Sequence, residues 1–261
     1  IEFLKNKIEF ISPQLIECKA KSPEPEDVLE NVLKKFGFSS ILKNKKVLIT
    51  AGPTVEQIDP IRAITNHSSG KTGVSLATEL ISAGAKVTFV YGPGKEKPPK
   101  GAKIINILSS KEMQLAVKLE LKKKFDIVIM AAAVADYVPT IQNKNKIKSS
   151  KSSMTISLKK APKIIDQIKK YQKNVLLVGF KAETNLTKNQ LIKSAEKKLK
   201  ESSADMIVAN DIGSIKYKKN PQKNQIIIVD SKKNIVSGWM NKEKIAKIIR
   251  KQIEVKLNEK I

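Results

Sequence analysis

Residues that commonly carry out nucleophilic or zinc chemistry are few in this chain. His67 is the single histidine and Cys18 the single cysteine among 261 residues. Zinc centres built from His and Cys need three or four such ligands, so a site of that kind is excluded. His67 stands in a Ser/Gly-rich turn, which favours a structural, hydrogen-bonding role over that of a general base. The chain therefore offers no plausible Cys–His pair and no Ser-His-Asp triad.

A Ser- and Gly-rich segment is the first candidate for such a site. It is Thr65–Gly73, TNHSSGKTG, and it leads into a helical pattern. Small residues let backbone N–H groups approach a phosphate at a helix N-terminus. A Walker A loop is not formed, because Thr65 stands where its first Gly is needed. A dinucleotide fingerprint is matched only at Gly70 and Gly73, so a nicotinamide-dependent oxidoreductase stays open as an alternative.

Two further segments follow apolar runs of strand length. Ala131–Tyr137 places small residues where a base or ribose can lie on the backbone. Val178–Asn185 combines a ring, a carboxylate and hydroxyl groups. The lysine-rich stretch 141–153 lies between them, and composition alone favours a charged surface loop there.

The elements that must position these segments alternate between strand and helix patterns. Apolar or β-branched runs predict strands at 46–50, 86–91, 102–108, 126–130, 154–158, 175–180 and 205–209. Helical periodicity predicts helices around 74–81, 113–117, 162–171, 191–199 and 245–257, and a β-hairpin is expected at 225–239. We expect an α/β protein: a three-layer Rossmann-like fold with a mostly parallel sheet and a β-hairpin extension near the C-terminus. In such a sheet ligands bind outside the carboxyl ends of the strands, where all three segments meet.

Composition sets further bounds. No apolar run has the roughly 20 residues that span a bilayer, and one cysteine agrees with a reducing, cytoplasmic setting. The net charge is +25, but lysines are dispersed and aromatics are 5%. This pattern favours a solvated basic surface suited to anionic substrates, and a basic nucleic-acid-binding protein is the second alternative.

Seven short pieces occur in the order in which one known family has them: Ile49–Thr54, Asp59–Arg62, Thr65–Lys71, Ala131–Tyr137, Lys146–Lys148, Val178–Thr184 and Ile207–Asp211. Over roughly residues 44–250 the chain resembles the phosphopantothenate–cysteine ligase family. The resemblance implies that 4′-phosphopantothenate attacks the α-phosphate of a nucleoside triphosphate and expels pyrophosphate. The amine of cysteine then displaces the nucleoside monophosphate, which gives 4′-phosphopantothenoylcysteine for coenzyme A synthesis.

The same resemblance implies roles for individual residues. Lys146 would stabilise negative charge at the phosphate, Asn66 would hold the acyl-nucleotide or the substrate, and Arg62 would contact a substrate carboxylate or phosphate. Nucleotide-binding residues would be Gly52, Ser69, Gly70, Ala131, Ala132, Ala133, Asp136, Lys146, Pro162, Lys163, Ile164, Ile165, Phe180 and Lys198. The family has a second lysine where Ser202 stands, and Lys197 or Lys200 is a candidate substitute.

The resemblance also implies partners and domain organisation. CTP is expected rather than ATP, because bacterial fused enzymes of this type use CTP; Mg²⁺ and a homodimer are expected with it, and no metal ligands can be named. Residues 41–261 would be the ligase domain. Residues 1–40 would be the C-terminal tail of an upstream flavin-dependent decarboxylase module, in which Cys18 is a candidate counterpart of a flap cysteine. FMN would belong only to that module, whose flavin-binding body is absent from the sequence.

Overall fold

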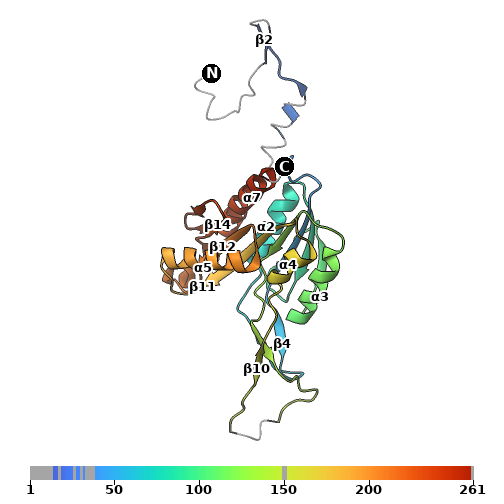
Figure 1. Cartoon of the computed structure of the whole chain (residues 1–261), viewed down its shortest axis with the longest axis vertical. Coiled ribbons are helices and arrows are strands. Elements are labelled where there is room, and N and C mark those ends of the chain that lie inside the picture. The colour runs from blue at the N-terminus through green and yellow to red at the C-terminus, as the bar shows by residue number, and fades with distance from the viewer. Residues whose placement is uncertain are drawn as a thin grey trace.

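The computed structural model describes residues 14–16, 19–25, 28, 29, 32, 39–148 and 152–259. Its body is an eight-stranded sheet with the strand order β15-β14-β12-β11-β8-β3-β6-β7 (Figure 1). The parallel strands are β3 (Lys46–Ala51), β6 (Lys86–Tyr91), β7 (Lys103–Asn106), β8 (Ile127–Met130), β11 (Leu176–Glu183) and β12 (Met206–Asp211). The predicted hairpin is present at one edge, where β14 (Ile227–Val229) and β15 (Asn234–Val236) pair antiparallel.

Helices cover both faces of this sheet and complete three layers. Alternate residues of a strand point to opposite faces, so Val47 and Ile49 of β3 pack under one helical layer and Leu48 under the other. The first layer holds α2 (Lys71–Ser82) and α7 (Lys242–Asn258). The second holds α3 (Ser110–Leu121), α4 (Ile165–Tyr171) and α5 (Lys188–Ser202). The predicted three-layer α/β fold with a mostly parallel sheet is confirmed.

The helix boundaries follow from local capping chemistry. Thr187 and Gln190 form a capping box at the start of α5, and Asn241 accepts a hydrogen bond from the Lys244 N–H at the start of α7. The short α6 (Ile215–Lys219) begins at Ser214 in the same way. By contrast, α2 follows Gly70 in a left-handed conformation and has no side-chain cap. The Lys71 N–H at its start donates instead to Ser69 Oγ, at 3.3 Å.

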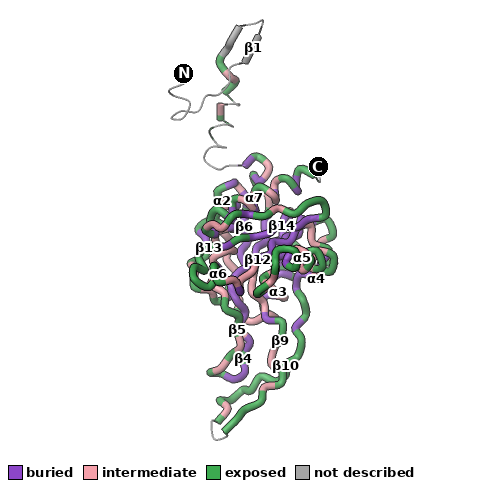
Figure 2. Tube along the Cα trace, turned by 90° about the vertical axis from the view of Figure 1, so that its left-hand side faces the viewer, coloured by how far each residue is buried: buried purple, intermediate pink, exposed green. Residues whose placement is uncertain are grey.

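An arm projects from the sheet body, and we define it as residues 55–65, 137–148 and 152–160 (Figures 1 and 2). It contains the hairpin β4 (Val55–Gln57) and β5 (Ala63–Thr65) and the ribbon β9 (Tyr137–Pro139) and β10 (Leu158–Lys160). The two halves are joined where the Gln142 amide donates to Gln57 Oε1 at 2.7 Å and the Asn143 N–H donates to the Ile58 carbonyl at 2.9 Å.

The remaining pairs are small: β1 (Gln14–Ile16) with β2 (Lys19–Lys21), and β13 (Lys223–Asn224) with β16 (Met240–Asn241). Two predicted elements differ from the structure. The strand expected at 154–158 is not formed there; the observed strand is β10, Leu158–Lys160. Alternating apolar residues stabilise a strand when one face packs on a core, and this ribbon projects away from the core (Figure 1). The helix expected from Pro162 begins at Ile165, after a turn. No helix in the described part of the chain is long and apolar enough to cross a membrane.

Candidate functional site

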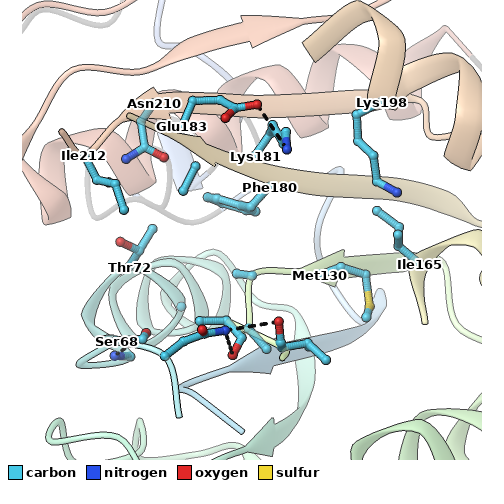
Figure 3. Close-up of a pocket in the computed structure, with 18 of the residues that line it drawn as sticks. Ser68, Thr72, Met130, Ile165, Phe180, Lys181, Glu183, Lys198, Asn210 and Ile212 are labelled. Carbon is cyan, nitrogen blue, oxygen red and sulfur yellow. Dashed lines mark hydrogen bonds and ion pairs between the residues drawn. The ribbon is translucent and has the colours of Figure 1, made fainter. Parts of the chain in front are cut away.

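A pocket of about 840 Å³ lies outside the carboxyl ends of β3, β8, β11 and β12. Strand β3 lies between β6 and β8. The chain therefore adds β6 and β7 on one side of β3 and then β8 on its other side. Such a switch point leaves a crevice at the strand ends. All three segments singled out in the sequence line this pocket. Figure 3 shows Phe180 and Lys181 of β11 on one side of it and Ser68 and Thr72 on the other.

The N-terminus of α2 forms one wall. Gly70 has φ 83°, and a Cβ there would lie 2.7 Å from the Tyr91 hydroxyl oxygen, so only glycine is accommodated without strain. That hydroxyl donates to the Glu96 carbonyl at 2.8 Å. Ser69 lies beside it at the pocket. The wall presents the positive end of a helix dipole, which favours an anion.

The floor is the strip Ala131–Ala133, held by strand-like hydrogen bonds. The Ala133 N–H donates to the Gly52 carbonyl at 2.9 Å, and the Asn66 amide donates to the carbonyls of Ala133 and Val134 at 3.2 and 3.1 Å. Gly52 has φ 76° and lies under the strip rather than in the pocket lining. Asn66 thus fixes the floor to the segment that leads into α2.

The opposite wall contains the other predicted nucleotide residues. Pro162, Lys163, Ile164, Ile165, Phe180 and Lys198 all line the pocket with Asp136. Lys163 pairs with Asp136, and Lys198 pairs with Asp166 at 2.8 Å. Ile164 and Ile165 are buried and anchor this wall on the α4 layer. The wall is therefore preformed and carries cations held in place by carboxylates.

Glu183 is a pocket carboxylate with two partners. The Ser194 hydroxyl donates to it at 2.6 Å, and Lys181 pairs with it at 3.1 Å. The Ser194 hydrogen bond, with Lys181, keeps its pKa below the usual value although burial opposes this. Glu183 stays ionised at neutral pH and is not set up to donate a proton.

Arg62 and Lys146 lie on the arm and do not line the pocket within the described chain. The fully buried Asp59 accepts hydrogen bonds from the Arg62 guanidinium at 3.0 Å and from the Ile147 N–H at 3.2 Å. Burial raises the pKa of Asp59, but the N–H donors of Ile61, Arg62 and Ile147, with the Arg62 charge, hold it below its ordinary value. Lys146 is exposed, next to the residue that Asp59 holds. Asp59 therefore holds the Arg62 side chain and the backbone beside Lys146.

The sequence also led to expectations for His67 and for the lysine candidates near Ser202. His67 is exposed and lines the pocket, and it makes no hydrogen bond to a described residue, so the expected structural bond is not found. Ser202 is buried and donates to the Lys198 carbonyl at 2.6 Å. Of the two candidate substitutes for the missing lysine, Lys197 lines the pocket and Lys200 does not.

Sequence reasoning missed the pocket residues contributed by the C-terminal elements. Tyr217, Asn224 and Lys242 line the pocket, and Lys242 is only 7% exposed. Lys242 belongs to an amphipathic helix with several other lysines. No pattern in the sequence separates a lysine that faces a pocket from those that face solvent.

The fold and the pocket define a three-layer α/β protein with a lysine-rich ligand pocket at the carboxyl edge of its sheet. Residues 42–256 match the family described as the DNA/pantothenate metabolism flavoprotein C-terminal domain. The chain belongs to this family.

Relatives and solved structures agree with this assignment. The coenzyme A biosynthesis bifunctional protein CoaBC of Thermococcus kodakarensis is 40% identical over 88% of this chain and 56% of its own length. The chain thus spans about half the length of the curated relatives it matches. The crystal structure of the C-terminal domain of a CoaBC protein is 35% identical, with a TM-score of 0.70 over 85% of this chain and all of that one. A Cab2 mutant in complex with phosphopantothenate-cysteine shares the fold, at 16% identity and a TM-score of 0.63 over 91% of this chain and 96% of that one.

Proposed function

We propose that this chain is the ligase that joins cysteine to 4′-phosphopantothenate in coenzyme A synthesis, through an acyl-nucleotide intermediate. Family membership and relatives named for coenzyme A biosynthesis support the proposal. The observation that carries it is the pocket itself, which gathers the matching segments around a helix N-terminus and several lysines. The pocket offers charge and positioning rather than a nucleophile.

The proposed reaction needs this kind of site. A carboxylate oxygen of 4′-phosphopantothenate forms a bond to the α-phosphorus, and the bond to the β-phosphate oxygen breaks, which releases pyrophosphate. The nitrogen of cysteine then attacks the acyl carbon, loses a proton to solvent or phosphate, and the nucleoside monophosphate leaves. Both steps are accelerated by fixed cations and N–H donors that face the developing negative charge.

We propose that the ligase is a homodimer in which the arm of one subunit completes the pocket of the other. Arg62 and Lys146 are absent from the lining formed by their own described chain. The arm also exposes large apolar side chains, which on a free surface are costly and mark interfaces: Ile61, Tyr137, Ile141, Met154 and Leu158.

A mixing experiment tests this arrangement. Lys146→Ala subunits and Asn66→Ala subunits are each expected to be inactive. A mixed dimer has one pocket with an intact floor and an intact arm from its neighbour, so mixing is expected to restore activity. If each arm serves its own pocket, mixing restores nothing.

We propose CTP as the nucleotide and Mg²⁺ as its counter-ion, because of the fused bacterial enzymes that the sequence resembles. The described residues contain no group of three His, Cys, Asp or Glu side chains that could hold a metal ion. Mg²⁺ bound through substrate phosphates and one or two carboxylates fits this pocket, whose lining carboxylates are Asp136, Glu183 and Glu201. The ion would offset the charge of the triphosphate.

We further propose the domain division 1–40 and 41–261, with the first part belonging to an upstream decarboxylase module that binds FMN. The family match begins at residue 42, which supports the boundary. Cys18, the candidate flap cysteine, lies outside the described residues.

The decisive assay is pyrophosphate release with 4′-phosphopantothenate and Mg²⁺, comparing CTP with ATP, with and without cysteine. CTP-dependent release, with amide product only when cysteine is present, is the expected result. Lys146→Ala is expected to abolish release, whereas Lys144→Ala, an exposed lysine of the same loop, leaves it unchanged. No release from the folded protein with either nucleotide would refute the ligase, and NADPH and nucleic-acid binding would then be measured.

A further inference from the structure

Lys242 differs from every other lysine of the pocket. Each of the others pairs with a carboxylate within the described residues: Lys71 with Glu243, Lys163 with Asp136, Lys181 with Glu183, Lys197 with Glu201 and Lys198 with Asp166. Lys242 forms no ion pair or hydrogen bond with any described side chain, although it is only 7% exposed. Its Nζ lies over the Tyr217 ring, 5.9 Å from the ring centroid. A desolvated ammonium without an anion is costly.

The surroundings of Lys242 add further positive charge. It is the first residue of α7, and α7 packs beside α2 in the same direction, as the ion pairs Lys71–Glu243 and Arg250–Glu79 show. Two helix N-termini therefore lie side by side at the pocket. Each contributes about half a positive charge. At the α2 end Gly70 supplies no capping side chain, and within the described chain the Ser69 hydroxyl accepts a hydrogen bond only from the Lys71 N–H.

The nearby carboxylates do not neutralise this charge. Glu243 is occupied by Lys71 at 3.2 Å. Burial lowers the pKa of Lys242 most and the charge of Lys71 lowers it further, while the charges of Glu96 and Glu243 raise it. Burial and the charge of Lys71 therefore both disfavour the ammonium, and a bound anion would offset them.

We propose that Lys242 and the N-terminus of α2 form a phosphate-binding subsite, which takes one phosphate group of a substrate. The proposal rests on the proposed ligase function and adds to it a positioning residue from the C-terminal helix. Two substrate sources share this chemistry: the outer phosphates of the nucleotide, and the phosphate ester of 4′-phosphopantothenate.

The test compares Lys242→Met with Lys244→Met. Methionine keeps an unbranched apolar stem and removes the charge. Lys244 is exposed on the same helical turn, and its side chain has no ion pair with a described residue, so its variant removes the same charge without touching the pocket. Binding is measured by calorimetry with pyrophosphate, CTP, CMP, 4′-phosphopantothenate and pantothenate.

Loss of a hydrogen bond to a charged group is expected to weaken binding about ten- to a hundredfold in Lys242→Met only. If the subsite holds the outer phosphates, pyrophosphate and CTP are weakened and CMP is not. If it holds the phosphate ester, 4′-phosphopantothenate is weakened and pantothenate is not. Unchanged affinity for all five probes overturns the proposal.

The melting temperature distinguishes a binding role from a structural one. Without ligand, Lys242→Met is expected to melt no lower than the wild type, because it removes a charge that has no ion pair with a described residue from a side chain that is mostly buried. A lower melting temperature together with wild-type affinities would make Lys242 a structural residue.

A measurement on the unaltered protein covers the case in which the variant does not fold. Amine labelling followed by mass spectrometry is expected to show Lys242 protected several-fold by pyrophosphate, CTP or 4′-phosphopantothenate, with Lys244 unaffected. The proposal is overturned if none of the three ligands changes the labelling of Lys242. Ligase turnover of the wild type is measured separately, so a protected Lys242 in an inactive protein would refute the ligase and leave the subsite standing.

Discussion

Gly73→Ala tests whether the close approach of α2 to β3 sets the geometry of the pocket. A Cβ at Gly73 would lie 2.4 Å from the Cβ of Ala51. Ordinary contacts between carbon atoms begin near ~3.4 Å, so the N-terminus of α2 would have to move by about 1 Å. The Ala51 Cβ belongs to a buried central strand and cannot rotate away.

Two opposing terms decide the stability of this variant. Alanine is favoured over glycine inside a helix by about 1 kcal/mol. Overpacking a well-packed contact costs about 1–3 kcal/mol. We expect a net loss of about 1 kcal/mol, seen as a fall of about 2–4 °C in the melting temperature. The displaced wall is expected to lower ligase turnover by roughly ten- to a hundredfold.

A second substitution, Ala51→Gly, tests whether the contact between residues 51 and 73 causes this loss. In Ala51→Gly/Gly73→Ala the new methyl group next meets the Cα of residue 51, at 3.5 Å, which is an ordinary contact. The pair is therefore expected to be more stable than the sum of the single variants, by about 1–3 kcal/mol. Gly238→Ala is the matched control, because its Cβ would meet only Met240 Cε at 3.5 Å. A Gly73→Ala variant with wild-type stability and turnover, or one that Ala51→Gly does not rescue, would refute the reasoning.

Three other perturbations have defined outcomes. Asp59→Asn removes the carboxylate that holds Arg62 and Ile147, and we expect slower ligation with CTP affinity little changed, measured by separate turnover and binding assays. Lys256→Met breaks a pair with Asp230 at 2.9 Å whose side chains are 8% and 4% exposed, and chemical denaturation at pH 7 should show a loss of roughly 3 kcal/mol. Burial raises the pKa of Asp230, but the Lys232 N–H, Lys256 and the Lys233 N–H outweigh burial and lower this pKa in the folded state. The ionised Asp230 therefore stabilises the fold above its unfolded pKa, and this stabilisation is lost as the pH falls through its folded pKa. Lys256→Met should therefore differ least from the wild type in acid. EDTA should stop turnover without lowering the melting temperature, because the described residues provide no metal cluster; a large fall would indicate a structural metal.

Sequence patterns predicted the sheet well where burial on both faces leaves a continuous apolar run. The runs at 46–50 and 126–130 became β3 and β8, and the glycine-bounded helix became α2. The strand prediction was wrong on the arm. The apolar side chains of Met154 and Leu158 are exposed there and do not pack on a core.

The candidate site was predictable where it follows strand ends and was not where it depends on tertiary packing. Asn66 and Phe180 lie in two of the segments expected at the strand ends, and both line the pocket because the ends of parallel strands converge. Their contacts with a nucleotide or substrate stay predictions. Lys242 was missed, because its position over the pocket is set by the docking of α7 on α2. The placement of Arg62 and Lys146 on the arm likewise depends on Asp59, which is distant from Ile147 along the chain.

The packing of α7 also has a consequence for the order in which the chain can fold. This helix closes the core beneath α2 with Ile245, Ile249 and Ile253, yet it follows every strand of the sheet in the chain. During synthesis the strands that share this apolar cluster emerge before α7, so the part of the cluster that α2 does not cover stays exposed until α7 is made. A ribosome stalled before α7 would therefore hold an aggregation-prone intermediate, and chaperone binding should end when this helix is released.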